Sequence, residues 1–477
     1  MTMLSRRSFL DRCCGGMGGL ALSTLLADAA RAQERKIDLT RPLDPRAPGR
    51  AARAKRVIFL FQYGGPSQVD TWDFKPELRT LHGQPVPGSF KETKDRVGGV
   101  FKACHDKLMH GPWGWKRYGE SGIAGSDLVA HTARHVDKLC FVRSMVADSS
   151  NHAPATYQMN TGAILPGRPS MGSWLTYGLG SENQNLPGYV LLFKVAGLGG
   201  AANWSNGFLP AAFQGTPFRH EGEPVLDLRP PQAYSEAQRD VLDALLDLNR
   251  QHRDERPGLV DLDGRIASYE LAYRMQSEAL EVGDLSGETK GTLEEYRVHS
   301  ENKAEAHYGR MCLLARRLSE KGVRVVQLYN AVDKFGWDGH DHNTTNHQAN
   351  ADQTDRPTAA LLSDLERRGL LDETLVVWAG EFGRTPMEQG NGGRNHNPYG
   401  FTIWMAGGGV RGGQAIGATD AIGLRADVDP HPVKNLHATI LAALGLRPDD
   451  LSFEHNGRPE RLTGVAGSSR VIPGVLG

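Results

Sequence analysis

The sequence predicts an α/β protein built on a doubly wound, mostly parallel sheet that is flanked by helices. Apolar runs of strand length recur along the chain, and such runs are typical of strands buried on both faces. Helical patterns separate these runs, which is the order expected for a parallel sheet. The chain has 477 residues, of which 39% are hydrophobic, so its length suits one large domain or two ordinary ones with a packed core.

The expected elements follow in chain order. Apolar runs predict strands at residues 55–63, 140–146, 189–193, 323–329, 374–379 and 401–406. Periodic patterns predict helices at residues 126–139 (with Ser126 as the N-cap), 306–322, 356–369 and 433–445. The stretch from about 230 to 300 is rich in charge and helix formers, and we expect a helical insertion there. The main domain is expected to span residues 55–465.

The N-terminus carries an export pattern. Arg6 and Arg7 form a twin-arginine pair, a short apolar stretch follows, and the tripeptide "ARA" offers a small-residue cleavage site. The alternative is a chance basic start before a buried helix. We expect residues 1–32 to be a twin-arginine signal peptide and residues 33–54 a polar linker. The apolar stretch is too short and too rich in glycine for a stable membrane anchor. The twin-arginine export machinery is therefore an expected partner, and the location periplasmic or secreted.

The charge balance bears on the class of partner. Basic and acidic residues number 55 each, so the formal net charge is zero. A nucleic-acid partner normally requires a basic excess, and none is expected here. Cys104, Cys140 and Cys312 are too few and too spread to form a disulfide framework, and the last two sit in apolar runs as expected buried residues.

Ionisable side chains follow the expected strands, or precede the last one. The carboxyl ends of parallel strands meet at one edge of a sheet, which is where such folds bind ligands. The candidates are Asp70, with Asp73 nearby, then His152, then Asp338, His340 and His342, then Glu381 and Arg384, and finally His396. Any one of them alone would be weak evidence, but their joint placement predicts a site.

The segment "FGWDGHDHN" gives this prediction its chemistry. In an extended stretch alternate residues project to one side, so Asp338, His340 and His342 could face one ion. Aspartate, glutamate and histidine ligands without cysteine suit a divalent zinc, manganese, iron or calcium ion. The alternative is that a polar loop is simply polar.

Other candidates also have structural alternatives. Asp70 suits a turn cap, and His152 suits a proline-containing turn. Glu381 could pair with Arg384 rather than with a metal. His437 shares a helix face with apolar residues and is expected to be a core histidine or one that supports a ligand.

Seven segments between about Lys55 and Arg461 carry a resemblance to a known family. They are "FQYGGPSQVDTWDFKP", "NHAPATYQMNTG", "GRPSMGSWLTYGLGSENQNLPGYV", "GWDGHDHN", "VVWAGEFGRTP", "GRNHNPYGFTIWMAGGGVRGG" and "LHATILAALG". Together they resemble the sulfatase-like domain family of unknown function 1501. Through that family the chain resembles the alkaline phosphatase superfamily, and the resemblance implies a doubly wound sheet and a metal site that hydrolyses phosphate or sulfate esters.

The resemblance also implies residue roles. Metal ligands are implied at Asp70, at Asp338 with His340 or His342, at Glu381 and at His396, for one or two ions. The nucleophile position departs from the sulfatase pattern, because His152, Pro154, Ala155 and Thr156 stand where a cysteine motif is usual. We therefore expect a metal-activated water or an unidentified nucleophile, with His152 at the reaction face. Arg384 is expected to bind the anionic group.

These observations predict an exported metal-dependent hydrolase of sulfate or phosphate esters, acting on a small molecule or a polysaccharide. The missing nucleophile leaves an alternative open, a non-catalytic binding or envelope protein that keeps the metal for structure. A metal-dependent isomerase or transferase of phosphorylated sugars is a third possibility, since fold alone does not fix chemistry.

Overall fold

The computed structural model describes residues 37–90, 104–226, 228–229, 237–256, 260–330 and 336–477. The predicted signal peptide and the first residues of the predicted linker lie outside these ranges. None of the helices in the described ranges combines the length and the apolar character needed to cross a bilayer.

The main sheet has nine strands, and most neighbours in it are parallel. β1 (Arg56–Phe61) lies between β7 (Val325–Tyr329) and β8 (Thr374–Ala379) and is parallel to both. β5 (Tyr189–Leu192) and β6 (Thr216–Phe218) continue the parallel order beyond β7. These strands agree with the apolar runs, so the predicted parallel core of the sheet is confirmed.

The other side of the sheet is mixed. β11 (Phe401–Ala406) runs antiparallel between β8 and β4 (Leu139–Val146). Two short strands, β12 (Gln414–Ile416) and β15 (His431–Pro432), then pair in parallel with β4. Because β11 reverses direction, its N-terminal end lies at the same edge as the C-terminal ends of β4, β8, β1 and β7.

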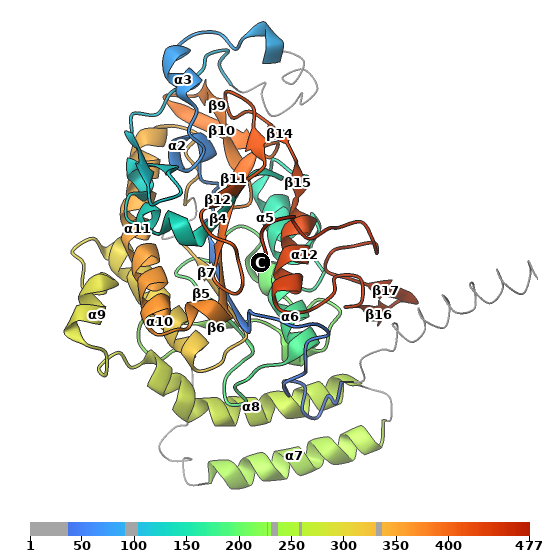
Figure 1. The fold of residues 1–477 in the computed structure, drawn as a ribbon. Helices are drawn as coiled ribbons and strands as arrows, with labels where there is room; N and C mark the ends of the chain where they lie inside the picture. The colour runs from blue at the N-terminus through green and yellow to red at the C-terminus, as the bar shows by residue number, and fades with distance from the viewer. Residues whose placement is uncertain (1–36, 91–103, 227, 230–236, 257–259, 331–335) are drawn as a thin grey trace, which may run out of the picture.

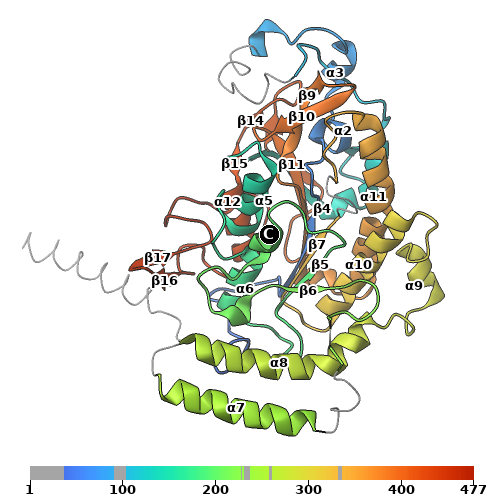
Figure 2. The same ribbon diagram turned by 180° about the vertical axis from the view of Figure 1, so that it is seen from behind.

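Helices cover both faces of the sheet (Figures 1 and 2). α10 (Lys303–Glu320) and α11 (Asn343–Arg367) lie on one face. α5 (His152–Thr161), α6 (Met171–Leu179) and α12 (Val433–Ala443) lie on the other. This two-sided covering is the doubly wound arrangement that the sequence predicts.

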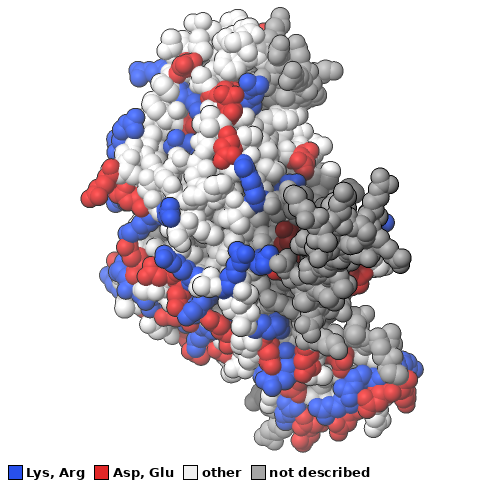
Figure 3. Space-filling view, turned by 45° about the vertical axis from the view of Figure 1, so that its right-hand side comes forward, with Lys and Arg blue, Asp and Glu red and all other residues white. Residues whose placement is uncertain are grey.

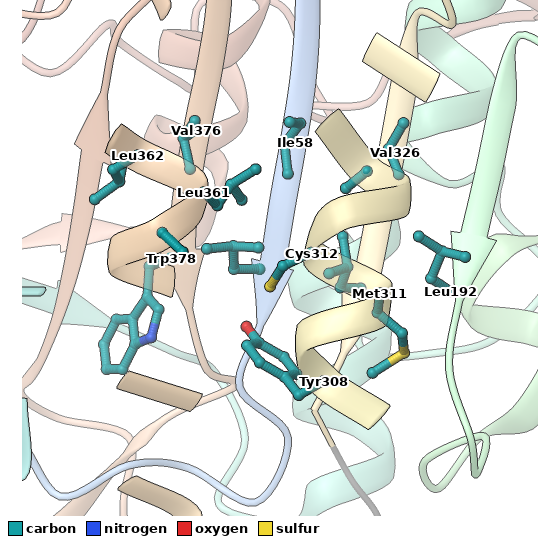
Figure 4. Packing of buried hydrophobic residues seen from close by; sticks show 14 of the residues in the cluster. Ile58, Leu192, Tyr308, Met311, Cys312, Val326, Leu361, Leu362, Val376 and Trp378 are labelled. Carbon is teal, nitrogen blue, oxygen red and sulfur yellow. The ribbon is translucent and has the colours of Figure 1, made fainter. Parts of the chain in front are cut away.

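The core follows from alternation along the strands. Ile58 and Leu60 of β1 belong to the apolar cluster beneath α10 and α11, whereas Val57, Phe59 and Phe61 belong to the cluster beneath α6 and α12. Figure 4 shows the first cluster, with Tyr308, Met311 and Cys312 of α10 and Leu361 and Leu362 of α11 among the side chains drawn against strand residues. Every residue of the central strands except Arg56 is buried, which explains their continuous apolar runs.

The prediction of an α-helix at residues 126–139 is wrong. Ser126 ends the short strand β3 (Ile123–Ser126), and two 3₁₀ segments follow at Asp127–Val129 and Thr132–Lys138. The Asp355 carboxylate accepts hydrogen bonds from the backbone N–H groups of His131 (2.7 Å) and Thr132 (2.8 Å). These bonds engage donors that a continuous α-helix would use within itself.

Two long helices lie at the lower end of the molecule (Figure 1), α7 (Gln238–Asp254) and α8 (Val260–Gly283). Figure 3 shows acidic and basic side chains interspersed at this end, as expected for a solvated helical surface. Residues of the predicted linker pack onto the body, where the backbone N–H of Arg46 bonds to the Leu179 carbonyl and that of Ala54 to the Ala443 carbonyl.

Other short α-helices and strands also lie in the described ranges. They are α2 (Gln68–Thr71), α3 (Pro76–Thr80), α9 (Lys290–Glu295), β2 (Trp115–Tyr118), β9 (Gly383–Gln389), β10 (Gly393–Asn397), β13 (Ala418–Thr419), β14 (Ala426–Val428), β16 (Phe453–His455) and β17 (Arg458–Glu460). The antiparallel β9–β10 hairpin matters most here, because it carries residues of the candidate site.

Candidate metal centre

The candidate centre lies at the carboxyl edge of the sheet, where separate connections meet. His152 opens α5 after β4, and Asp338 and His340 lie between β7 and α11. Glu381 comes directly after β8, and His396 sits on β10. The fold therefore brings together five of the residues singled out from the sequence.

Three imidazoles surround one carboxylate. Nε2 of His340 and Nε2 of His396 lie 3.1 Å and 3.3 Å from Oδ1 of Asp338. Nε2 of His152 lies 3.2 Å from Oδ2 of the same carboxylate. The Nε2 atoms of His340 and His396 are 2.8 Å apart. One ligand atom from each of these four residues lies within 4.8 Å of the others.

The outer nitrogen of each ring is held by an oxygen. Nδ1 of His152 lies 2.6 Å from Oε1 of Glu381, Nδ1 of His340 lies 2.7 Å from Oε1 of Gln389, and Nδ1 of His396 lies 2.5 Å from the Ser150 carbonyl oxygen. These oxygens accept hydrogen bonds, so each Nδ1 carries a proton, and a ring without a second proton presents its Nε2 lone pair inward. Histidines that bind metals are oriented in this way.

The inward-facing groups favour a positive charge between them. Burial lowers the pKa of His152, but hydrogen bonds to Asp338 and Glu381 and their negative charges raise it more, to about 9. Burial lowers the pKa of His396 to about 3. Burial would raise the pKa of Asp338, yet hydrogen bonds from the three histidines and the charge of Arg384 hold it well below its usual range. The cluster therefore favours a positive charge at its middle, either a proton or a cation.

The dimensions fit a small divalent ion. Metal–nitrogen bonds of 2.0–2.1 Å place tetrahedral ligands about 3.3 Å apart. The separations of 2.8–3.3 Å among these nitrogen and oxygen atoms are close to that spacing. Three imidazole nitrogens and a carboxylate suit zinc, manganese or iron.

Comparison with known proteins places the chain in a family. The family described as "Protein of unknown function (DUF1501)" matches residues 54–476. The chain belongs to this family. The sequence resemblance to DUF1501 is thereby confirmed.

Solved structures give more distant likenesses to this DUF1501 chain. A mutant of TAB5 alkaline phosphatase is 9% identical with a TM-score of 0.34, over 83% of this chain and 99% of its own. The PsFucS1 sulfatase from Pseudoalteromonas sp. is 10% identical with a TM-score of 0.33, over 83% and 68%. The lipoteichoic acid synthase LtaP from Listeria monocytogenes is 9% identical with a TM-score of 0.35, over 86% and 77%. No curated protein matches the sequence.

In this DUF1501 chain, Arg384 lies behind the candidate metal centre rather than on its open side. Its side chain has no exposed surface. Nη2 donates to Oδ1 of Asp338 (2.7 Å) and to the Gly64 carbonyl, Nε donates to the Gly65 carbonyl (3.0 Å), and Nη1 donates to the Arg394 carbonyl (3.1 Å). With its donors engaged inside the protein, Arg384 orients Asp338. The expected role in binding an anionic substrate group has no geometric basis.

Glu381 is also completely buried. Its carboxylate accepts hydrogen bonds from the Gly64 backbone N–H (2.9 Å) and from His152. It does not belong to the group whose ligand atoms converge. In this geometry Glu381 fixes His152 instead of contacting an ion.

Two further candidates lie apart. Asp70 is buried in an ion pair with Arg394. His342 is exposed, precedes α11 and adopts a left-handed backbone with φ 52°. That conformation breaks the extended alternation from which the sequence prediction placed His342 beside His340. Neither joins the converging group.

The structure also places two residues whose roles the sequence left open, Thr156 and His437, and shows two that the sequence reasoning missed. Thr156, a hydroxyl near the nucleophile position, is fully buried one turn inside α5. His437 is a core residue whose Nε2 donates to the Met159 carbonyl (2.8 Å), in agreement with the sequence. Gln389 and Arg394 were missed, because an amide and an arginine in a short hairpin carry no ligand pattern.

Proposed function

We propose that this protein is an exported metal-dependent hydrolase of sulfate or phosphate esters. The observation that carries the proposal is the set of three inward-facing Nε2 atoms around the Asp338 carboxylate, each ring anchored by an oxygen behind it. The choice of ester rests on the sequence resemblance to a sulfatase-like family. Export rests on Arg6 and Arg7, which lie outside the described residues.

The residues divide into an ion-binding group and a proton-transfer pair. Asp338, His340 and His396 would hold one divalent ion and leave further positions open, as two-histidine, one-carboxylate sites do. When bound, the ion would polarise an ester oxygen and favour ionisation of a water. The His340 side chain is 35% exposed, more than its neighbours, so the centre opens to solvent on this side.

His152 is suited to move a proton. Its Nδ1–H points at the Glu381 carboxylate, which fixes the ring and stabilises its protonated form. Its Nε2 lies 3.2 Å from Oδ2 of Asp338, beside the place expected for the ion, where it would take a proton from an attacking water or give one to the leaving oxygen. No cysteine or exposed serine motif is needed in this scheme, which agrees with the missing sulfatase nucleophile.

One observation favours the second candidate, a non-catalytic metal protein. If His152 binds the ion as well, four protein ligands close a tetrahedral shell, and closed shells are typical of structural sites. The two functions predict different behaviour of His152→Gln. In the hydrolase the variant keeps its metal and loses turnover, whereas in the binding protein it loses metal.

The test has two steps. Metal content is measured by mass spectrometry for the protein and for the Asp338→Ala, His340→Ala double variant. Near-stoichiometric metal that disappears in the variant supports the centre, and folded protein without metal in both refutes the proposal. Aryl sulfate and aryl phosphate turnover is then compared between the parent and His152→Gln with the identified ion.

A further inference from the structure

Asp70 and Arg394 form a buried ion pair beside the metal centre. Nε of Arg394 lies 2.7 Å from Oδ2 of Asp70, and Nη2 lies 2.9 Å from Oδ1, so the guanidinium covers both carboxylate oxygens. Nδ2 of Asn343 donates to Oδ2 as well, at 3.1 Å. The two charged side chains are 1% and 0% exposed. Both oxygens of Asp70 therefore already face N–H donors.

Arg394 is itself fixed in this position. Nη2 also donates to the Met109 carbonyl (2.9 Å), and Nη1 donates to the Thr385 carbonyl (3.0 Å). Its backbone N–H donates to the Gly339 carbonyl (2.9 Å), which lies between two residues of the metal centre. A guanidinium with four side-chain bonds and a backbone bond is a permanent part of this site.

One histidine beside Asp70 is not available to a metal ion. His347 interacts electrostatically with Asp70, but its Nε2 accepts a hydrogen bond from the Ser67 backbone N–H at 3.0 Å. That lone pair is consequently engaged. The metal centre differs, because three imidazole Nε2 atoms point inward there, whereas the guanidinium of Arg394 already lies against Asp70 here.

Arg384 connects the metal centre with the Asp70–Arg394 ion pair. It donates through Nη2 to Asp338 and through Nη1 to the carbonyl of Arg394. Asp338 and Asp70 thus sit in one buried framework with two guanidinium groups. Asp338 retains three histidine partners around it, whereas both oxygens of Asp70 accept hydrogen bonds from Arg394.

We infer that the centre binds a single metal ion and that the guanidinium of Arg394 supplies the positive charge at the place where Asp70 would otherwise hold a second ion. This inference rests on the proposed metal centre and fixes its stoichiometry. It follows that Asp70 is a structural counter-ion, and that its substitution acts on folding rather than on metal content.

The experiment combines metal counting with an unfolding cycle on the full chain. Zinc or manganese is added in excess, free metal is removed, and bound equivalents are measured for the parent, Asp70→Asn, Arg394→Gln and the double variant. Melting temperatures of the same four proteins are measured in chelator, so that metal does not contribute. The double variant carries no net buried charge, which keeps it informative if either single variant folds poorly.

One equivalent of metal in the parent and in the double variant supports the inference. So does a double variant that melts well above the value expected from adding the two single losses. Two equivalents in the parent, with one lost when Asp70 is replaced, would overturn it, as would additive losses of melting temperature. No metal in the parent would refute the proposed function, and the unfolding cycle would still decide whether Arg394 is the counter-ion of Asp70.

Discussion

Replacing Glu381 by glutamine tests whether the anchoring of His152 matters for the ion. The carboxylate accepts the His152 Nδ1–H at 2.6 Å inside the protein, where Glu381 has no exposed surface. A hydrogen bond to a charged group contributes ~1.5–3 kcal/mol, and a neutral one about 1. Glu381→Gln should therefore weaken the hydrogen bond that holds the His152 ring by about 0.5–2 kcal/mol. That converts to a roughly two- to thirty-fold change.

The assay is metal binding by competition with a chromophoric chelator, together with ester turnover. If His152 binds the ion, the apparent Kd should rise by that factor. If His152 only transfers the proton, the Kd should stay constant and kcat should fall instead. Glu366→Gln is the matched control, because Glu366 forms an exposed pair with Lys138. A Glu381 variant with unchanged Kd and unchanged kcat would refute the assigned role of Glu381.

Further predictions concern packing, titration and substrate charge. Gly393→Ala should weaken metal binding, because a Cβ there would lie 1.7 Å from the His340 carbonyl oxygen. Gly287→Ala is the control, because a Cβ there would lie in open space. Equal metal Kd values for the parent and Gly393→Ala would contradict this prediction. His437 is buried with its pKa lowered to about 4 from 6.5, so the stability it contributes is present above pH 6.5 and falls toward pH 4. Between pH 7.5 and 5 the parent should lose ~2 kcal/mol more unfolding free energy than His437→Gln in urea titrations, and parallel losses would refute this. A nitrophenyl sulfate or a phosphodiester should be turned over with a higher kcat/KM than the corresponding phosphate monoester dianion, and the reverse order would contradict the single-ion centre.

The parallel core of the fold was predictable because its signal is local. Strands buried on both faces read as apolar runs, and those runs agree with the central strands. Helix α11 was harder to predict. It begins at Asn343 rather than near 356, and its first half is polar. Asn350 and Gln353 in that half bond to the carbonyls of Gly336 and Asn330, so tertiary contacts rather than an apolar stripe support this turn of the helix.

The site was predictable only in part. Residue type and position after a strand identified His152, Asp338 and His340, because the carboxyl edge of a parallel sheet is defined by the strands themselves. His396 was identified by its type and by its position just before the run at 401–406. The same reasoning could not separate Asp70 from them. Ligand and counter-ion share the residue type and the position, and only the three-dimensional partner distinguishes the two.

The buried charges link the number of ions to the substrate. Asp70, Asp338 and Glu381 carry three negative charges, and Arg384 and Arg394 carry two positive ones, all within one framework of hydrogen bonds. These five groups have a net charge of minus one. A divalent ion at the centre would repel a proton on His152 and keep the histidines neutral, so a single ion would bring the charge to plus one. A site with that charge complements a monoanion, such as a sulfate monoester or a phosphodiester, without leaving an unpaired charge in a desolvated pocket. A second divalent ion would raise the charge to plus three and favour a dianion, so the guanidinium of Arg394 bears on substrate choice as well as on the metal count.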